Sequence, residues 1–134
     1  ENIKKLRDQF ISKKNIYLNK FNQNVANLYK ISDVVVIPSI ADESFGYVYP
    51  EASLFKKPVI ASKIGGLKEI INNNYDGYLV SVDNYKSFSI SILKLINNKN
   101  LAKLITSRSY KKVKNKFSAK LMSNNYYKTI NRYK

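Results

Sequence analysis

The sequence contains no cysteine and no histidine, and these two absences exclude whole classes of chemistry. Without cysteine there is no disulfide and no thiolate nucleophile. Without histidine there is no Ser-His-Asp or Cys-His arrangement, no imidazole general base, and most zinc sites are excluded. Only nine acidic residues remain that could bind a metal ion. We therefore expect neither a metal site nor a cofactor.

Long apolar segments are also absent. The longest apolar runs span about five residues, whereas a membrane-spanning helix needs roughly 20. Residues 1–10 lack the apolar centre of a signal peptide. The 134 residues suffice for one domain with a buried core, and 44% hydrophobic and 25% charged residues are typical of globular proteins. We expect a cytoplasmic protein.

Acidic residues are few beside 24 basic ones, so the formal net charge is +15. Such a chain can bind nucleic acid, anionic lipid or phosphorylated ligands. Arginine, the preferred partner of phosphates and base edges, occurs only at Arg7, Arg108 and Arg132. We therefore interpret most of the charge as a solvated lysine surface and expect no nucleic acid. Peripheral contact with an anionic membrane, at its inner face, stays open.

The hydrophobic pattern predicts strands alternating with helices. The apolar runs at 33–37 and 58–61 indicate strands covered on both faces, as in a parallel sheet. Alternating strands and helices imply right-handed crossovers, so we predict one α/β domain with a Rossmann-like parallel sheet flanked by helices. Because the chain opens on a helix, at least one strand–helix unit is expected to be missing from its front. The other predicted strands are 16–18 and 78–82, and the predicted helices are 1–14, 22–30, 46–55, 67–72 and two or three from 84 onward, with Ser118 as the N-cap of the last.

The loop after the strand at 33–37 carries the strongest chemical signal. Ligands of open parallel sheets bind beyond the carboxyl ends of the strands. The helix predicted to begin at Gly46 would offer free N–H groups and a partial positive charge to a phosphate. Glu43 precedes this helix and Glu51 lies inside it, so the two acids follow the spacing E-x7-E. On its own this spacing is a weak signal.

Several short motifs surround this acidic pair. They are Pro38-Ser39, Glu43-Ser44-Phe45-Gly46, Glu51-Ala52, Lys57-Pro58-Val59-Ile60-Ala61-Ser62, Gly65-Gly66, Glu69-Ile70-Ile71 and Gly77-Tyr78-Leu79-Val80. From 33 to 82 the chain thus resembles the C-terminal, nucleotide-sugar-binding domain of retaining glycosyltransferases of family 4, which have the GT-B fold. The resemblance continues more loosely on either side, where Phe117-Ser118 matches a late F-S of the family.

The resemblance implies an incomplete GT-B C-terminal domain over 1–134, without the N-terminal acceptor domain. It implies a hexosyltransferase that moves a sugar from a donor such as a UDP- or GDP-sugar to a glycan or lipid-linked hydroxyl acceptor, with retention. Polysaccharide biosynthesis is the implied setting, and no metal is required. In the family, the basic residues that bind the diphosphate lie upstream of this sequence. Residues 1–134 alone are therefore expected to be inactive.

The resemblance also implies roles for individual residues. An ionised carboxylate accepts two O–H donors from a vicinal diol, which suits both acids. Glu43 is expected to contact hydroxyls of the donor sugar as the catalytic-site acid, and Glu51 the ribose hydroxyls. The implied donor-sugar and diphosphate contacts are the backbone at Phe45, Gly46 and Tyr47, with Gly65 and Gly66, and the implied base-binding loop is Asn19, Lys20 and Phe21.

The sequence departs from the family at two positions that usually hold glycine. Asn19 stands after the strand at 16–18, which leaves the identity of the base open. Lys56 stands before Lys57-Pro58-Val59, where glycine would stop a helix. A non-glycine residue must therefore form this second turn.

Other interpretations remain. Glu43, Glu51, Glu69 and Lys20 are also compatible with solvated surface residues, and Gly65-Gly66 with a plain turn. The whole chain is also compatible with a non-catalytic nucleotide-binding or interaction module. A nucleic-acid-binding protein with stacking tyrosines, or a phosphorylase-like or epimerase relative that shares the GT-B architecture, are further alternatives.

Overall fold

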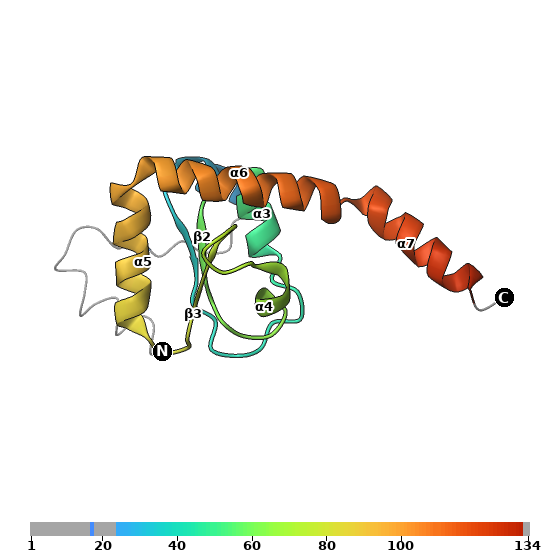
Figure 1. Ribbon diagram of the computed structural model, residues 1–134, viewed down its shortest axis with the longest axis horizontal. Helices are drawn as coiled ribbons and strands as arrows, with labels where there is room; N and C mark the ends of the chain where they lie inside the picture. Colours follow the sequence, from blue (N-terminus) through green and yellow to red (C-terminus); the bar gives the residue numbers. More distant parts are fainter. Residues whose placement is uncertain (1–16, 18–23, 133–134) are drawn as a thin grey trace.

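The computed structural model describes Tyr17 and residues 24–132 of the chain, and Figure 1 shows its ribbon. The helix predicted at 1–14 and the base-binding loop Asn19, Lys20 and Phe21 lie outside the described residues. The strand predicted at 16–18 does too, apart from Tyr17, which belongs to no helix or strand. The other predicted elements lie within the described part.

Three parallel strands form the sheet in the order β1-β2-β3. They are β1 (Val35–Ile37), β2 (Val59–Ser62) and β3 (Tyr78–Val80). β2 is the central strand, with Ile60 opposite Val36 on one side and Tyr78 on the other, and all four of its residues are buried. The predicted parallel sheet is therefore confirmed, with shorter first and last strands. β1 ends before Pro38, which has no N–H to donate to a ladder.

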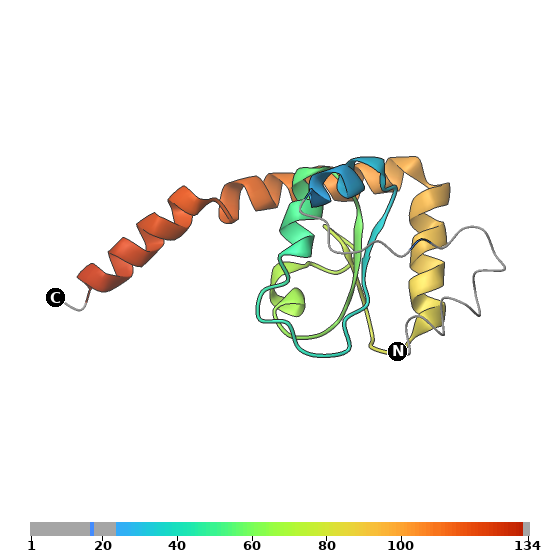
Figure 2. The same cartoon turned by 180° about the vertical axis from the view of Figure 1, so that it is seen from behind.

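Two hydrophobic cores cover the two faces of the sheet, because successive strand residues point to opposite sides. Val59 and Ala61 of β2 face the core beneath α2 (Val25–Ile31), α3 (Val48–Leu54) and α4 (Leu67–Ile70). Ile60 faces the other core, beneath α5 (Tyr85–Asn97). Figures 1 and 2 show α5 on one side of the sheet and α3 and α4 on the other.

Two further helices follow α5. Helix α6 (Lys99–Lys116) runs across the amino ends of the strands and contributes to both cores, Ile105 to one and Val113 to the other. Helix α7 (Ala119–Asn131) extends away from the domain and buries none of its residues (Figures 1 and 2). None of the helices in the described part of the chain combines the length and the apolar character of a membrane span.

Capping side chains and backbone conformation set where the helices begin and end. Asn84, Asn98 and Ser118 each accept a hydrogen bond from a backbone N–H of the first turn, so the predicted N-cap at Ser118 is confirmed. The helix predicted from Gly46 begins only at Val48, because Gly46 has a φ of +76° that a helix cannot contain. After α3, Lys56 adopts a φ of +54°, so a non-glycine residue does form this turn.

Candidate functional site

Two loops that leave the carboxyl ends of neighbouring strands lie against each other. The first follows β1 and contains Glu43; the second follows β2 and contains Gly65 and Gly66. The Gly66 N–H donates to the Glu43 carbonyl oxygen at 2.7 Å. The Gly65 N–H donates to Oδ1 of Asp42 at 2.9 Å. These two hydrogen bonds hold the acidic loop at the edge of the sheet where ligands of such folds bind.

The glycine pair is needed because the two backbones approach closely. A Cβ at Gly65 would lie 2.4 Å from the carbonyl oxygen of Glu43, and Gly65 has a φ of +41°. A Cβ at Gly66 would lie 2.4 Å from the carbonyl oxygen of Ser44. Close packing therefore requires glycine here, beyond any need of a turn. Both N–H groups already have acceptors within the protein. The predicted contact of Gly65 and Gly66 with a diphosphate stays a prediction.

Glu43 is half-buried and its side chain is oriented by a neighbour. The Ser39 hydroxyl donates to Oε1 of Glu43 at 2.6 Å. A Cβ at Gly46 would lie 3.1 Å from Oε2, so this oxygen lies close to the glycine. Within the described residues Oε2 accepts no hydrogen bond and is free for a ligand. Ser39 belonged to a recognised motif, but only the structure reveals its contact.

Glu51 lies in the first turn of α3, where the helix dipole favours a carboxylate. Its side chain is exposed, yet Oε2 accepts a hydrogen bond of 2.8 Å from the hydroxyl of Tyr29 in α2. Sequence analysis missed Tyr29. Its only signal was its place in the helix predicted at 22–30, which equally suits an ordinary core residue.

Free backbone donors lie between the two acids in the sequence. Within the described part of the chain, the N–H groups of Phe45, Gly46 and Tyr47 have no hydrogen-bond acceptor. Phe45 anchors this segment, since its ring contacts those of Tyr47 and Phe117 at centroid distances of 5.1 and 5.5 Å. Glu43 and a short run of free amides thus occupy one edge of the sheet, and Glu51 follows them in the first turn of α3. Such a set can accept hydroxyl protons and bind an anion.

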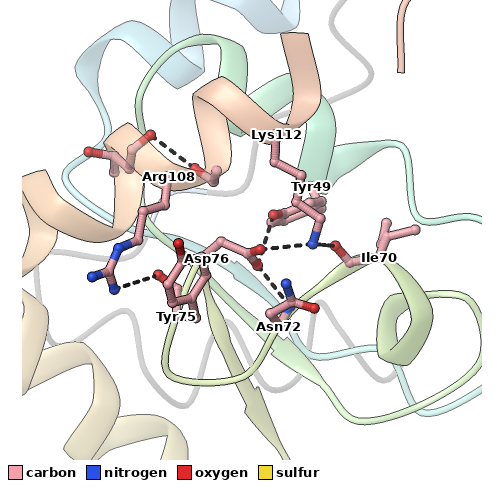
Figure 3. A network of polar contacts seen from close by, with 9 residues as sticks. Tyr49, Ile70, Asn72, Tyr75, Asp76, Arg108 and Lys112 are labelled. Carbon is pink, nitrogen blue, oxygen red and sulfur yellow. Dashed lines mark hydrogen bonds and ion pairs between the residues drawn. The ribbon is translucent and has the colours of Figure 1, made fainter. Parts of the chain in front are cut away.

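A buried polar network lies beside α6, just before the amino end of β3 (Figure 3). The Asp76 side chain is 1% exposed and accepts hydrogen bonds from the hydroxyl of Tyr49 at 3.1 Å and the N–H of Asn72 at 2.8 Å. Lys112 of α6 forms an ion pair with it at 2.8 Å and donates to the Ile70 carbonyl at 2.6 Å. The network joins α3 and α4, the helices that follow the two site loops, to α6. Asp76 lies in the turn before Gly77 and β3, and the sequence gives no sign of its burial.

Both tyrosines that contact carboxylates remain protonated donors. Burial, then the charge and hydrogen bond of Asp76, raise the pKa of the Tyr49 hydroxyl well above its ordinary value of 10.0. Burial, then the hydrogen bond and charge of Glu51, raise the pKa of Tyr29 likewise. Neither hydroxyl ionises near neutral pH, so both keep donating to their carboxylates.

A hollow lies beside the carboxyl ends of the strands, on the face of the sheet covered by α5. It has a volume of about 270 Å³ and contains none of the predicted site residues. The lining of the hollow is Val36, Pro38, Ile40, Ser62, Val82, Asp83, Tyr85, Phe88 and Ser89.

Over the described residues, no three acidic side chains gather as a metal site would require.

Most of the predicted site residues that the structure describes thus lie at the edge of the sheet formed by the two loops. Glu43, the Phe45–Tyr47 backbone and the glycine pair adjoin one another, and Glu51 follows along α3. The roles assigned to these residues remain predictions.

Comparison with known proteins supports the resemblance described from the sequence. The sequence model described as "Glycosyl transferases group 1" matches residues 1–112. A protein of Methanocaldococcus jannaschii described as an uncharacterized glycosyltransferase is 40% identical over 81 residues, which are 60% of this chain and 23% of that protein. The chain therefore corresponds to less than a quarter of this relative's length.

Two solved structures show the same fold. The C-terminal domain of a group 1 glycosyl transferase from Francisella tularensis matches with a TM-score of 0.75 and 27% identity, over 88% of this chain and 64% of that one. The Anabaena protein HepE, solved with UDP-glucose, matches with a TM-score of 0.89 and 24% identity, over 97% of this chain and 36% of that one. The predicted fold, a parallel sheet flanked by helices that matches part of a GT-B C-terminal domain, is thereby confirmed.

Proposed function

Because the chain belongs to the glycosyl transferases group 1 family, we propose that it supplies the donor-binding half of a retaining hexosyltransferase. The enzyme transfers a sugar from a nucleoside diphosphate sugar to a hydroxyl of a glycan or a lipid-linked acceptor. The observation that carries the proposal is the arrangement of Glu43 and the free amides of Phe45, Gly46 and Tyr47 at one edge of the sheet, with Glu51 following in the first turn of α3.

In the proposed mechanism, these groups hold the donor and stabilise its departure. Glu43 accepts hydrogen bonds from hydroxyls of the donor sugar, and Glu51 accepts them from the ribose hydroxyls. As the bond to the anomeric carbon breaks, the diphosphate gains negative charge, and preorganised N–H dipoles stabilise that charge. The two acids act as binding groups and not as a glycosidase acid and nucleophile pair.

The nature of the donor is supported by a relative of the same fold. HepE of Anabaena was solved with UDP-glucose, which is a donor of the proposed kind. We therefore take a uridine diphosphate sugar as the first donor to test. We also propose that the reaction takes place in the cytoplasm. The base-binding role of Asn19, Lys20 and Phe21 remains part of the proposal.

Removal of the Glu51 carboxylate tests the ribose assignment. Glu51→Ala should weaken binding of UDP by roughly 1–3 kcal/mol, or about 5- to 150-fold, because hydrogen bonds to a charged group are lost. Ligand-observed NMR against UDP, GDP and ADP measures the effect. The matched control is Glu69→Ala, which removes an exposed acid from α4 and should leave binding unchanged. Equal affinity of the Glu51→Ala and unaltered chains would contradict the assignment.

A contact with an anionic membrane forms a second part of the proposal. No acidic residue follows Asp83, so α5, α6 and α7 carry only basic charges. Such a surface attracts anionic headgroups and would bring the donor site near a lipid-linked acceptor.

A further inference from the structure

We propose that Tyr29 is a positioning residue that orients the Glu51 carboxylate toward the ribose of the bound nucleotide. This inference rests on the proposed function and adds to it a residue outside the recognised motifs. The hydroxyl of Tyr29 donates to Oε2 of Glu51 at 2.8 Å, across 22 residues of sequence. Within the described residues, Oε1 accepts no hydrogen bond and remains open to a ligand.

The hydroxyl can orient the carboxylate because the Tyr29 ring is itself held firmly. The side chain is 7% exposed and belongs to the core beneath α2, α3 and α4. Its ring stacks on that of Phe55 with a centroid distance of 5.5 Å and an interplanar angle of 24°. Phe55 is the C-cap of α3, the helix that carries Glu51. A rigid donor thus contacts an exposed and otherwise mobile acid.

A second contact joins α2 to the end of α3. The Lys57 ammonium, just beyond α3, donates to the Lys30 carbonyl in the last turn of α2 at 2.9 Å. Helix α2 is therefore attached to α3 at its end as well as through the stacked rings. The position of the Tyr29 hydroxyl relative to Glu51 follows from helix packing and does not depend on a flexible loop.

Orientation before binding should increase affinity. A free glutamate side chain loses rotational freedom when a ligand holds it, and this loss weakens binding. The bond to Tyr29 fixes one carboxylate oxygen in advance and leaves the other to accept a ribose hydroxyl. The raised pKa of Tyr29 keeps its proton in place as the donor. The expected signature is a loss of affinity that depends on the ribose hydroxyls.

The test compares Tyr29→Phe with the unaltered chain, using two probes. The substitution removes only the hydroxyl and keeps the stacked ring. UDP should bind the variant about three- to tenfold more weakly, the scale of the cost of ordering one flexible side chain on binding. The second probe, 2′,3′-dideoxyuridine diphosphate, lacks the ribose hydroxyls and should bind both chains equally. A purely structural defect would weaken both probes together.

The control is Tyr78→Phe, at an equally buried tyrosine on the other face whose hydroxyl makes no hydrogen bond within the described residues. It should bind UDP as the unaltered chain does. If Tyr29→Phe keeps full UDP affinity while Glu51→Ala loses it, the positioning role is wrong and the ribose site stands. If Glu51→Ala also keeps full affinity, the ribose site itself is wrong and the positioning role with it.

Discussion

The Asp76 carboxylate is a buried charge whose two oxygens are both occupied. Oδ1 accepts from Tyr49 and Asn72, and Oδ2 pairs with Lys112. A buried ion is tolerated only when its charge is paired and its remaining lone pairs are satisfied, and this one meets both conditions. The Tyr49 side chain is fully buried, so its hydroxyl must stay neutral for the network to persist.

Alkaline pH should therefore weaken the fold through Tyr49. Its folded pKa lies above the unfolded value of 10.0, so the stabilisation is complete below pH 10 and is lost as pH rises toward the folded pKa. The free energy of unfolding should fall by about 1 kcal/mol less in Tyr49→Phe than in the unaltered chain between about pH 9 and pH 11. Urea titrations at several pH values measure this difference. Tyr75→Phe, at a tyrosine that is 52% exposed, is the control, and parallel curves for all three proteins would contradict the effect.

Residues of the site differ in how far the sequence reveals them. Glu43 and Glu51 were predicted because they lie in a contiguous motif with fixed spacing. Tyr29 and Lys112 were not, because their contacts with Glu51 and Asp76 span 22 and 36 residues and exist only after the helices pack. Gly65-Gly66 was predicted as a pair, but its physical cause, the backbone of the acidic loop, lies more than 20 residues away and is visible only in the structure.

At the level of elements, the end of α3 carries strain that the sequence does anticipate. Lys56 adopts a φ of +54°, a conformation that costs a residue with a Cβ about 1–2 kcal/mol. A glycine would avoid this cost. The ammonium of Lys56 lies 5.3 Å from the centre of the Tyr110 ring, and this contact offsets part of the strain.

Two substitutions separate these effects. Lys56→Ala removes the contact with Tyr110 but keeps a Cβ, whereas Lys56→Gly removes both. The free energy of unfolding of Lys56→Gly should exceed that of Lys56→Ala by about 1 kcal/mol. Chemical denaturation measures both values. Equal stability of the two variants would show that the turn is not strained.

Element types were predictable from the sequence, whereas element bounds were less so. The strand predicted at 33–37 begins only at Val35, and the one predicted at 78–82 ends at Val80. Strand ends depend on where the neighbouring strand stops pairing, and β2 offers partners only from Val59 to Ser62. The predicted helices at 1–14 and 22–30 differ in outcome, since the first lies outside the described residues and the second is confirmed as α2.

Over the whole molecule, charge is distributed unevenly along the chain. Every acidic residue lies at or before Asp83, so the elements that follow are purely basic. The long span of α6 across the amino ends of the strands and the extension of α7 away from them were not predictable, because no local pattern encodes such placement. The parallel sheet itself was predictable, because buried strands alternate with helices.

Vesicle binding tests the electrostatic consequence. The chain should co-sediment with vesicles of anionic phospholipid and detach as salt shortens the Debye length from about 10 Å at 0.1 M to about 3 Å at 1 M. The double substitution Lys120→Glu and Lys128→Glu in α7 should weaken binding. The control pair Lys63→Glu and Lys68→Glu has the same net charge, lies at exposed positions near α4, and should have less effect. Equal binding to neutral vesicles would contradict an electrostatic contact with anionic lipid.

The central claim is that the edge formed by the two loops holds a nucleoside diphosphate sugar. The most direct measurement is a UDP titration of the chain and of Glu51→Ala, followed by backbone amide chemical shifts. The largest shifts should fall on Phe45, Gly46 and Tyr47, whose N–H groups are free, and smaller ones on Gly65 and Gly66, whose N–H groups are bonded. The shifts should weaken in the variant. Saturable shifts elsewhere, for example on α6 and α7, with none at Phe45–Tyr47, would contradict the claim.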